Sequence, residues 1–376
     1  AQAASGFELP WPVSSVTGAE VHIMAPLRVM AQLVASSLAA LALDSAPGPL
    51  PPQAGAAAAS LDFLVMGDWG GEPLWPYKTP GEVAVARSMG ELAAKVGATY
   101  SLALGDNFYF SGVDSVDDAR FQETFENVFT SASLKGKDHF RVLAGNHDHN
   151  GNCSAQIAYS KKSERWHFPN FYYDFVEEVG GGVQVHHVMI DTVLLAGQSE
   201  DFRTGQPLTG SQYTGPANPL IAEQQWHWIN TTLAASTADY LIVAGHFPVW
   251  SVCEHGPTQQ LVERLKPMLE ASQASVYLAG HDHCAQHLDE GKGVQYHGVG
   301  AGFMYNPSTA HKGAVPAGSL KFHYDSGILG VMRGAFAHVS VRSSGLVVSH
   351  YSSDGHQLYE APPVLPRTIA RRLLQI

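Results

Sequence analysis

The sequence has few cysteines, few basic residues and no long apolar runs. An abundance of any of these would indicate a particular class of protein. It has 3 cysteines in 376 residues, too few for copper(I) or iron–sulfur sites, which need several thiolates. Lys and Arg number 22 against 34 Asp and Glu, which gives a formal net charge of −12. Nucleic acids and anionic membranes bind basic stripes, so we expect neither as a partner.

The apolar run that comes nearest to a membrane segment is Met30 to Leu43, which follows Arg28. It is too short for a stable membrane span. Ala40-Leu41-Ala42 offers the small residues of a signal-peptidase site, so a signal peptide is the favoured interpretation. The run is preceded by 29 residues, of which 23 lie before Met24. Either Met24 is the true start of the chain, or the segment is a transit or anchor sequence.

Five short apolar runs are each followed by a turn that carries metal-binding side chains. The runs are Leu61–Met66, Tyr100–Leu104, Val142–Ala144, Leu241–Ala244 and Val276–Ala279. The turns are Gly67-Asp68-Trp69-Gly70, Gly105-Asp106-Asn107-Phe108-Tyr109, Gly145-Asn146-His147-Asp148-His149, Gly245-His246-Phe247-Pro248 and Gly280-His281-Asp282-His283. Such runs predict buried strands. A ligand just past the carboxyl end of a buried strand is held rigidly and points into a crevice, and the glycine before it allows close backbone approach.

The polar side chains in these turns are donors for borderline to hard metal ions. They comprise two carboxylates, three imidazoles, one amide and one phenol: Asp68, Asp106, His246, His281, His283, Asn146 and Tyr109. This set suits Fe(III), Fe(II), Zn(II) or Mn(II). Two such cations a few ångströms apart can clamp a phosphate and activate water. Together, and in this order, the five turns therefore predict a two-metal phosphoesterase.

The turns resemble those of the purple acid phosphatases, a family within the metallophosphoesterase superfamily. The similarity is greatest to the short, single-domain type typified by mammalian tartrate-resistant acid phosphatase, and it runs from about Leu61 to about Pro366. It extends beyond the ligand turns to Ser154–Lys161, Val243–Ser251, Glu254–Thr258 and Phe322–Tyr324. The resemblance implies an α/β fold, a four-layer α/β/β/α sandwich of two mixed β-sheets.

Carried over to this sequence, the family pattern implies a dinuclear centre. Fe(III) would bind Asp68, Asp106, Tyr109 and His283, and a divalent Fe, Zn or Mn ion would bind Asp106, Asn146, His246 and His281, with Asp106 as the bridge. A metal-bound hydroxide would be the nucleophile. His147 and His255 would hydrogen-bond the phosphoryl oxygens, and one of them would protonate the leaving group.

Other polar residues in the turns are expected to support the ligands. We expect Asp148 and Asp282 to hold the ligand loops, and His149 to orient the Asn146 turn or Asp148. Trp69 is either a wall of the site or an ordinary packed tryptophan.

The remaining pattern predicts one catalytic domain between two flanking segments. Helical patterns cover Pro80–Val96, Asp118–Thr130, Leu220–Ala234 and Thr258–Ala271, and a hairpin is expected over Ala335–Val341 and Gly345–Tyr351. We expect an N-terminal targeting or linker segment at 1–59, processed or disordered, a metallophosphoesterase catalytic domain at 60–366 and a C-terminal tail at 367–376.

Two sequons favour a secretory route. Asn152-Cys153-Ser154 and Asn230-Thr231-Thr232 predict a glycoprotein that is secreted or vacuolar/lysosomal. The odd number of cysteines leaves at least one thiol unpaired or intermolecular. We interpret Cys253 and Cys284, which lie near the ligand turns, as small buried residues rather than ligands. The Gly197–Pro219 loop matches a repressive loop of mammalian relatives, and a plain flexible loop is an equal interpretation.

The predicted function is that of an acid phosphatase that hydrolyses small phosphomonoesters, as a monomer. A related metallophosphoesterase acting on phosphodiesters or nucleotide pyrophosphates is the alternative among enzymes. A metal or phosphate sensor without catalysis is a third hypothesis, which the complete set of ligands and candidate acid histidines disfavours.

Overall fold

Two seven-stranded β-sheets form the body of the chain in the computed structural model, which describes residues 59–201, 206–207, 213–325 and 333–367. The first sheet has the order β16 (Gln357–Glu360), β15 (Gly345–Ser352), β14 (Ala335–Arg342), β1 (Leu61–Met66), β2 (Ser101–Leu104), β3 (Phe140–Leu143) and β4 (Trp166–His167). The second has the order β13 (Leu320–His323), β11 (Ala285–Asp289), β12 (Gln295–Val299), β10 (Val276–Ala279), β9 (Tyr240–Gly245), β6 (Val183–Met189) and β5 (Tyr173–Gly180). Each sheet combines parallel and antiparallel neighbours.

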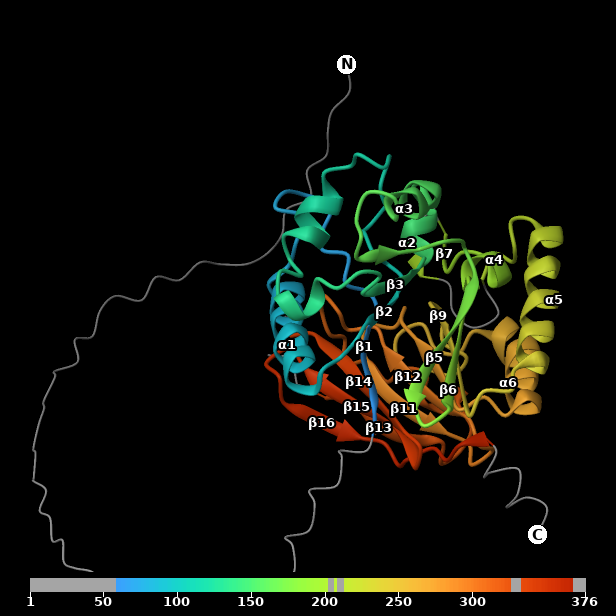
Figure 1. Cartoon of the computed structure of the whole chain (residues 1–376). Helices are drawn as coiled ribbons and strands as arrows, with labels where there is room; N and C mark the ends of the chain where they lie inside the picture. Colours follow the sequence, from blue (N-terminus) through green and yellow to red (C-terminus); the bar gives the residue numbers. More distant parts are fainter. Residues whose placement is uncertain (1–58, 202–205, 208–212, 326–332, 368–376) are drawn as a thin grey trace, which may run out of the picture. The chain divides into compact units, whose positions relative to one another are not determined.

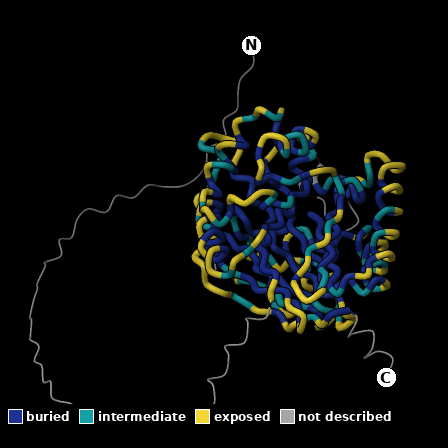
Figure 2. Tube along the Cα trace, viewed as in Figure 1, coloured by how far each residue is buried: buried dark blue, intermediate teal, exposed yellow. Residues whose placement is uncertain are grey.

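Helices cover the outer faces of this sandwich (Figure 1). α1 (Pro80–Val96) contacts β1 and β14, while α5 (Pro219–Ala235) contacts β6 and packs beside α6 (Lys266–Ser272). The apolar core between the sheets includes Phe63 and Leu102 from the first and Val185 and Ile242 from the second, and buried residues fill the interior in Figure 2. The four-layer α/β/β/α sandwich of two mixed β-sheets is thus confirmed.

Helix α1 begins and ends at residues that cap helices well. Thr79 accepts a hydrogen bond from the Glu82 backbone N–H, and the Glu82 carboxylate accepts one from the Thr79 N–H. Pro80 occupies the first turn, and Gly97 ends the helix in the left-handed conformation (φ 72°). These residues satisfy backbone groups that a helix end leaves without partners.

Shorter elements connect the layers. They are α2 (Asn146–His149), α3 (Cys153–Tyr159), α4 (Thr192–Ala196) and the small ribbon of β7 (Glu200–Asp201) and β8 (Gln206–Pro207). The expected helix at Asp118–Thr130 is shorter than predicted, a π-helical turn at Phe121–Glu126. The expected hairpin is confirmed as β14 and β15.

The parallel strands bring the ligand turns together. β1, β2 and β3 run parallel in the first sheet, and β9 and β10 run parallel in the second. Their carboxyl ends therefore open on one edge of each sheet, where open α/β sheets place their sites.

Two cysteines are buried, as expected, and they also pair with each other, which the sequence left open. Cys253 and Cys284 form a disulfide, with an S–S distance of 2.05 Å and a sequence separation of 31. The pairing arises because the loops after β9 and β10 leave adjacent parallel strands. Cys153 is buried and unpaired, so the expected odd thiol is present.

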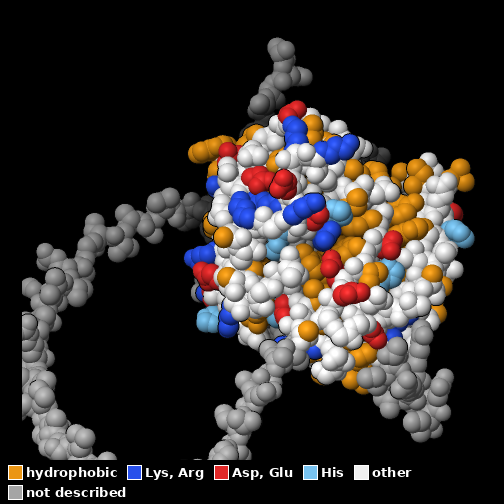
Figure 3. Space-filling view, viewed as in Figure 1, with side chains coloured by type: hydrophobic (Ala, Val, Ile, Leu, Met, Phe, Trp, Pro, Cys, Tyr) orange, Lys and Arg blue, Asp and Glu red, His pale blue; other side chains and the backbone are white. Residues whose placement is uncertain are grey.

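The predicted signal segment, the linker up to residue 58, parts of the Gly197–Pro219 loop and the tail after residue 367 lie outside the described residues. Within the part that the structure describes, no helix is long and apolar enough to cross a membrane. On the face shown in Figure 3, Lys and Arg side chains lie beside Asp and Glu side chains, so this face mixes both signs of charge.

Candidate metal centre

The seven predicted ligands meet where the two sheets end. Asp68 follows β1, Asp106 follows β2 and Asn146 begins α2 after β3, while His246 follows β9 and both His281 and His283 follow β10. Ligand atoms of Asp68, Asp106 and His246 all lie within 4.8 Å of one another, a possible metal site. The first sheet thus supplies the carboxylates and the second supplies the imidazoles.

One group of donors surrounds the Tyr109 hydroxyl. This oxygen lies 3.1 Å from Asp68 Oδ1 and 3.0 Å from His283 Nε2, and His283 Nε2 lies 3.6 Å from Asp68 Oδ1. Burial raises the pKa of Tyr109 well above its ordinary value, and the negative charges of Asp68 and Asp106 raise it further. The phenol therefore keeps its proton unless a cation replaces it.

A second group of donors surrounds His246 Nε2. It lies 3.0 Å from the Asn146 side-chain oxygen and 3.4 Å from Asp106 Oδ1. His246 Nδ1 lies 2.8 Å from the Leu104 carbonyl oxygen. Since a carbonyl only accepts, Nδ1 carries a proton. Burial opposes protonation of the ring, yet the charges of Asp106 and Asp68 raise the pKa of His246 to about 9, so Nε2 also holds a proton, which it shares with the carboxylate and amide oxygens. A cation between them would satisfy all three groups.

The charge balance of the site also fits a cation. Asp68 and Asp106 are 0% and 1% exposed. Among the described residues, the ion pairs of these two carboxylates are formed with His147, His246 and His283. Burial opposes ionisation of Asp106, yet His246 and His147 lower its pKa. Buried carboxylates need such compensation, and metal ions supply it in many sites.

Backbone geometry lets the ligands approach one another. Asp68, Asp106 and His281 themselves adopt left-handed φ values of 56°, 50° and 70°. A Cβ atom added at Gly145 would lie 2.2 Å from Asp106 Oδ1, and one at Gly280 would lie 2.5 Å from Asp68 Oδ2. The glycines before the ligands are therefore required by close approach, as predicted.

The two predicted substrate-side histidines flank the ligands. His147 Nδ1 lies 2.8 Å from the Phe110 carbonyl oxygen, which places the proton on Nδ1, and its Nε2 lies 3.9 Å from Asp106 Oδ2. The His255 ring stacks on the His281 ring with centroids 4.2 Å apart.

Two carboxylates hold the ligand turns, as expected. Asp148 accepts hydrogen bonds from Gly145 N at 2.9 Å and from Asn107 N at 3.1 Å. Asp282 accepts one from His255 N at 2.7 Å. His149 does not contact Asp148 through its ring, contrary to one expectation, because its Nε2 lies 2.7 Å from Asp191 Oδ2.

The contacts of Arg120 and Tyr213 with the site were not predicted. Arg120 donates to the backbone carbonyls of Tyr109 and Gly70. The Tyr213 hydroxyl lies 3.1 Å from His281 Nε2, which leaves Nδ1 of that ring for a cation. Of the two alternatives for Trp69, the structure favours an ordinary packed tryptophan, because the ring is fully buried against Phe108 and other aromatic rings.

Comparison with known proteins agrees with this geometry. The Calcineurin-like phosphoesterase family matches residues 61–285. Tartrate-resistant acid phosphatase type 5 of Homo sapiens is 44% identical over 322 residues, which cover 85% of this chain and 94% of that protein. The same enzyme of Oryctolagus cuniculus is 45% identical, over 82% of this chain and 92% of that protein. Purple acid phosphatase 17 of Arabidopsis thaliana is 30% identical, over 74% and 78% respectively.

Solved structures share the fold. GAP50, the anchor in the inner membrane complex of Plasmodium, has a TM-score of 0.67 at 20% identity and covers 82% of this chain and 90% of its own. Purple acid phosphatase PPD1 from yellow lupin has a TM-score of 0.54 at 14% identity, over 83% of this chain and 54% of its own. At these identities the likeness concerns the fold alone. The extensive identity to the tartrate-resistant enzymes is what shows that the chain belongs to the purple acid phosphatases of the Calcineurin-like phosphoesterase family, a family with a dinuclear metal centre, and is an acid phosphatase.

Proposed function

We propose that this acid phosphatase works with an Fe(III) ion and a divalent Fe, Zn or Mn ion. Fe(III) would be held by Asp68, Asp106, Tyr109 and His283, and the divalent ion by Asp106, Asn146, His246 and His281. The observation that carries the proposal is the convergence of a buried phenol, two buried carboxylates and the Nε2 atom of a buried imidazole. When bound, the two cations would acidify a water molecule and neutralise charge on the phosphoryl group.

Asp106 is the residue that would serve both ions. Its Oδ1 faces His246 Nε2 at 3.4 Å and also accepts the His147 backbone N–H at 3.0 Å. Its carboxylate also borders Tyr109, whose pKa it raises. A carboxylate with neighbours in both donor groups can bridge two cations, which fixes their separation.

His147 and His255 would contact the phosphoryl group. His147 is fixed by its bond to the Phe110 carbonyl, so its Nε2 is directed toward the Asp106 side of the site. His255 is fixed by its backbone bond to Asp282 and by stacking on His281. In the protonated form either ring can donate to a phosphoryl oxygen, and one can give its proton to the leaving group.

Metal analysis tests the ligand assignment. We expect two metal ions per wild-type chain, at least one of them iron, and loss of the divalent ion in His246→Ala. The matched control is His227→Ala, because His227 is exposed on α5. A single ion per chain in active wild-type protein would contradict the dinuclear assignment.

Leaving-group dependence tests the histidines. p-Nitrophenolate leaves without protonation, whereas an alkoxide needs a proton. Loss of the acid histidine should therefore lower kcat at least about tenfold more for an alkyl phosphate than for p-nitrophenyl phosphate. Equal losses for both esters in His147→Ala and His255→Ala would exclude both as the acid.

We also propose a secretory route to a vacuolar, lysosomal or extracellular location, with the catalytic domain at 60–366 between the segments 1–59 and 367–376. The buried Cys253–Cys284 disulfide supports an oxidising compartment. Asn152 and Asn230 are exposed, so both sequons are accessible to glycosylation. Mass spectrometry of native protein with both asparagines unmodified would count against this route.

A further inference from the structure

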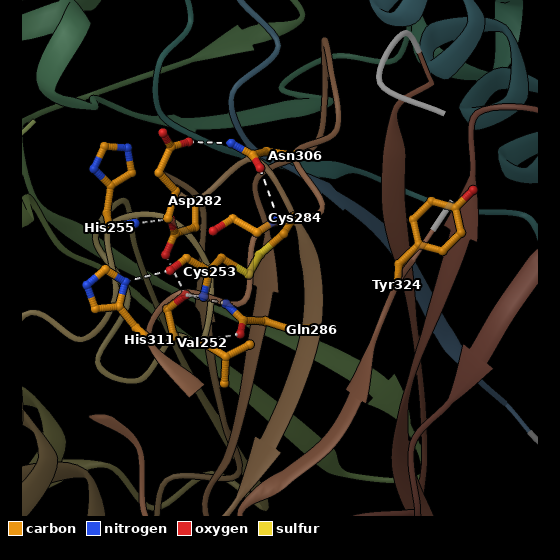
Figure 4. Close-up of a disulfide and its surroundings, with 12 residues drawn as sticks. Val252, Cys253, His255, Asp282, Cys284, Gln286, Asn306, His311 and Tyr324 are labelled. Carbon is orange, nitrogen blue, oxygen red and sulfur yellow. Dashed lines mark hydrogen bonds between the residues drawn. A yellow bond between two sulfur atoms is a disulfide. The ribbon is translucent and has the colours of Figure 1, made fainter. Parts of the chain in front are cut away.

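The loop that carries His255 is tied by a disulfide to the turn that carries His281 and His283. Figure 4 shows this bond beside His255 and Asp282. Residues 251–256 form no helix or strand. Cys253 stands two residues before His255, and its partner Cys284 directly follows His283. Both sulfurs belong to residues that are at most 1% exposed. The disulfide therefore joins the proposed substrate-side histidine to the proposed metal ligands through a very short path of backbone.

Side-chain hydrogen bonds reinforce the same connection. Asp282 accepts from His255 N at 2.7 Å with one oxygen and from the Ser251 hydroxyl with the other. Gln286 accepts from Val252 N at 3.0 Å and donates to Ser251 Oγ at 2.7 Å. Residues 251, 252, 253 and 255 are thus each connected to residue 282, 284 or 286.

The opposite side of the loop is held by His311. Its Nδ1 donates to the Cys253 carbonyl at 2.8 Å, and its backbone N–H donates to the Val252 carbonyl at 3.0 Å. A Cβ at Gly256 would lie 2.5 Å from His311 Cγ, so the ring packs directly against the loop. The loop backbone is held from two sides, and the half-buried His255 ring extends from it to stack on His281.

We propose that Cys253 and Cys284 are positioning residues of the phosphatase reaction: their bond holds the His255 imidazole at the distance from His281 at which it can contact the phosphoryl group. This inference rests on the role proposed above for His255. A displacement of about 1 Å in a reacting group can cost about 100-fold in rate, so a covalent restraint at this place has a direct effect on turnover. Thiol–disulfide exchange requires access to a sulfur, and burial of both sulfurs favours a permanent restraint over a redox switch.

Peptide mapping without reduction is the first part of the test, because it does not depend on activity or on bound metal. We expect a cross-linked pair of peptides containing residues 253 and 284. In the Cys253→Ser/Cys284→Ser variant, we expect faster amide hydrogen exchange over residues 251–256 and unchanged exchange over residues 101–106. Free thiols at both positions of native protein, or one extra zinc ion bound there with His323, whose ligand atom lies within 4.8 Å of both sulfurs, would overturn the proposal.

A double-mutant cycle is the second part. We expect Cys253→Ser/Cys284→Ser to keep its metal content and to lose about 10- to 100-fold in kcat/KM. In a His255→Ala background, removal of the disulfide should cost no more than about twofold, because its effect acts through that ring. Cys153→Ser, which removes the buried unpaired thiol and keeps the sequon, is the matched control and should retain activity.

The outcomes separate this proposal from the one on which it rests. An equal loss in both backgrounds, or loss of metal from the cysteine variant, overturns the positioning role and leaves the role of His255 intact. Full activity of His255→Ala overturns both. If the cysteine variant does not fold, Ser251→Ala loosens the same loop without touching the sulfurs, and its loss of kcat/KM should likewise vanish in the His255→Ala background.

Discussion

The Arg120 guanidinium donates to the backbone carbonyl of Tyr109 and, with its other terminal nitrogen, to that of Gly70. One buried side chain thereby holds both the phenol-bearing loop and the loop after Asp68. The two carbonyls lie 11 and 50 residues from Arg120 in sequence. The planar fork of arginine suits this task, and the single ammonium of lysine does not.

Arg120→Lys should therefore lower activity while the chain stays folded. We expect a loss of about 10- to 100-fold in kcat or in iron affinity, the range typical of residues that orient metal ligands. The check is kcat together with iron content. Arg264→Lys is the control, since Arg264 forms an exposed pair with Glu223. Unchanged kcat and iron content in Arg120→Lys would contradict this role.

Asp106→Asn tests the shared carboxylate. Because Asp106 borders both donor groups, its replacement should reduce the content of both metal ions and lower kcat by at least about 1000-fold. Asp68→Asn should chiefly reduce iron. If Asp106→Asn and Asp68→Asn each lost the same single metal ion to the same extent, Asp106 would not bridge the two ions.

Tyr213→Phe removes the hydroxyl that lies 3.1 Å from His281 Nε2. Loss of the bond should weaken the orientation of that ring, so affinity for the divalent ion should fall about 10-fold or more while iron is retained. Titration of iron-loaded protein with zinc measures this directly. Tyr240→Phe is the control, because Tyr240 bonds to the Arg342 carbonyl away from the ligands. Loss of iron instead would contradict the assignment of His281 to the divalent ion.

Much of the fold and of the site could be predicted because the signals are local. The strands before Asp68 and His281 were predicted with the bounds that the structure has, since an apolar run followed by a ligand is a pattern of adjacent residues. Tyr213 and the Cys253–Cys284 bond were not predicted. Tyr213 lies 68 residues from His281 in sequence, and no local pattern records a contact between residues so far apart.

The partner of His149 shows the same limit. Its ring lies close in sequence to Asp148, yet it bonds to Asp191, 42 residues away. The Asp148 carboxylate bonds instead to Gly145 and Asn107. Sequence proximity indicates which residues share a turn and does not fix where each side chain points.

Three buried histidines between the sheets set an acid limit on stability. His287, His297 and His350 stack, with His297 Nδ1 3.1 Å from His350 Nε2. Burial lowers the pKa of His287 to about 4 and that of His350 to about 3, and it also lowers the pKa of His297. Below the unfolded pKa of 6.5, the unfolded chain binds protons that the folded chain does not.

These histidines therefore do not lower the free energy of unfolding above about pH 6.5. As the pH drops from there toward about 4, each of them lowers the free energy of unfolding by about 1.4 kcal/mol per pH unit. Calorimetry from pH 7 to pH 4 should show this slope. In His350→Gln, the slope of the unfolding free energy against pH should be smaller by the amount that one bound proton contributes. The exposed control His227→Gln should leave the slope unchanged. A slope in His350→Gln equal to that of the wild type would contradict the assignment.

Tyr109 provides the most direct test of the central claim, that a tyrosinate-bound Fe(III) ion works beside a divalent ion. The measurement is the visible absorption spectrum of purified protein before and after mild reduction, with metal content determined on the same sample. We predict a purple charge-transfer band that shifts on reduction, accompanies iron loading and is absent in Tyr109→Phe. A colourless, active protein that contains only zinc or manganese would contradict the account.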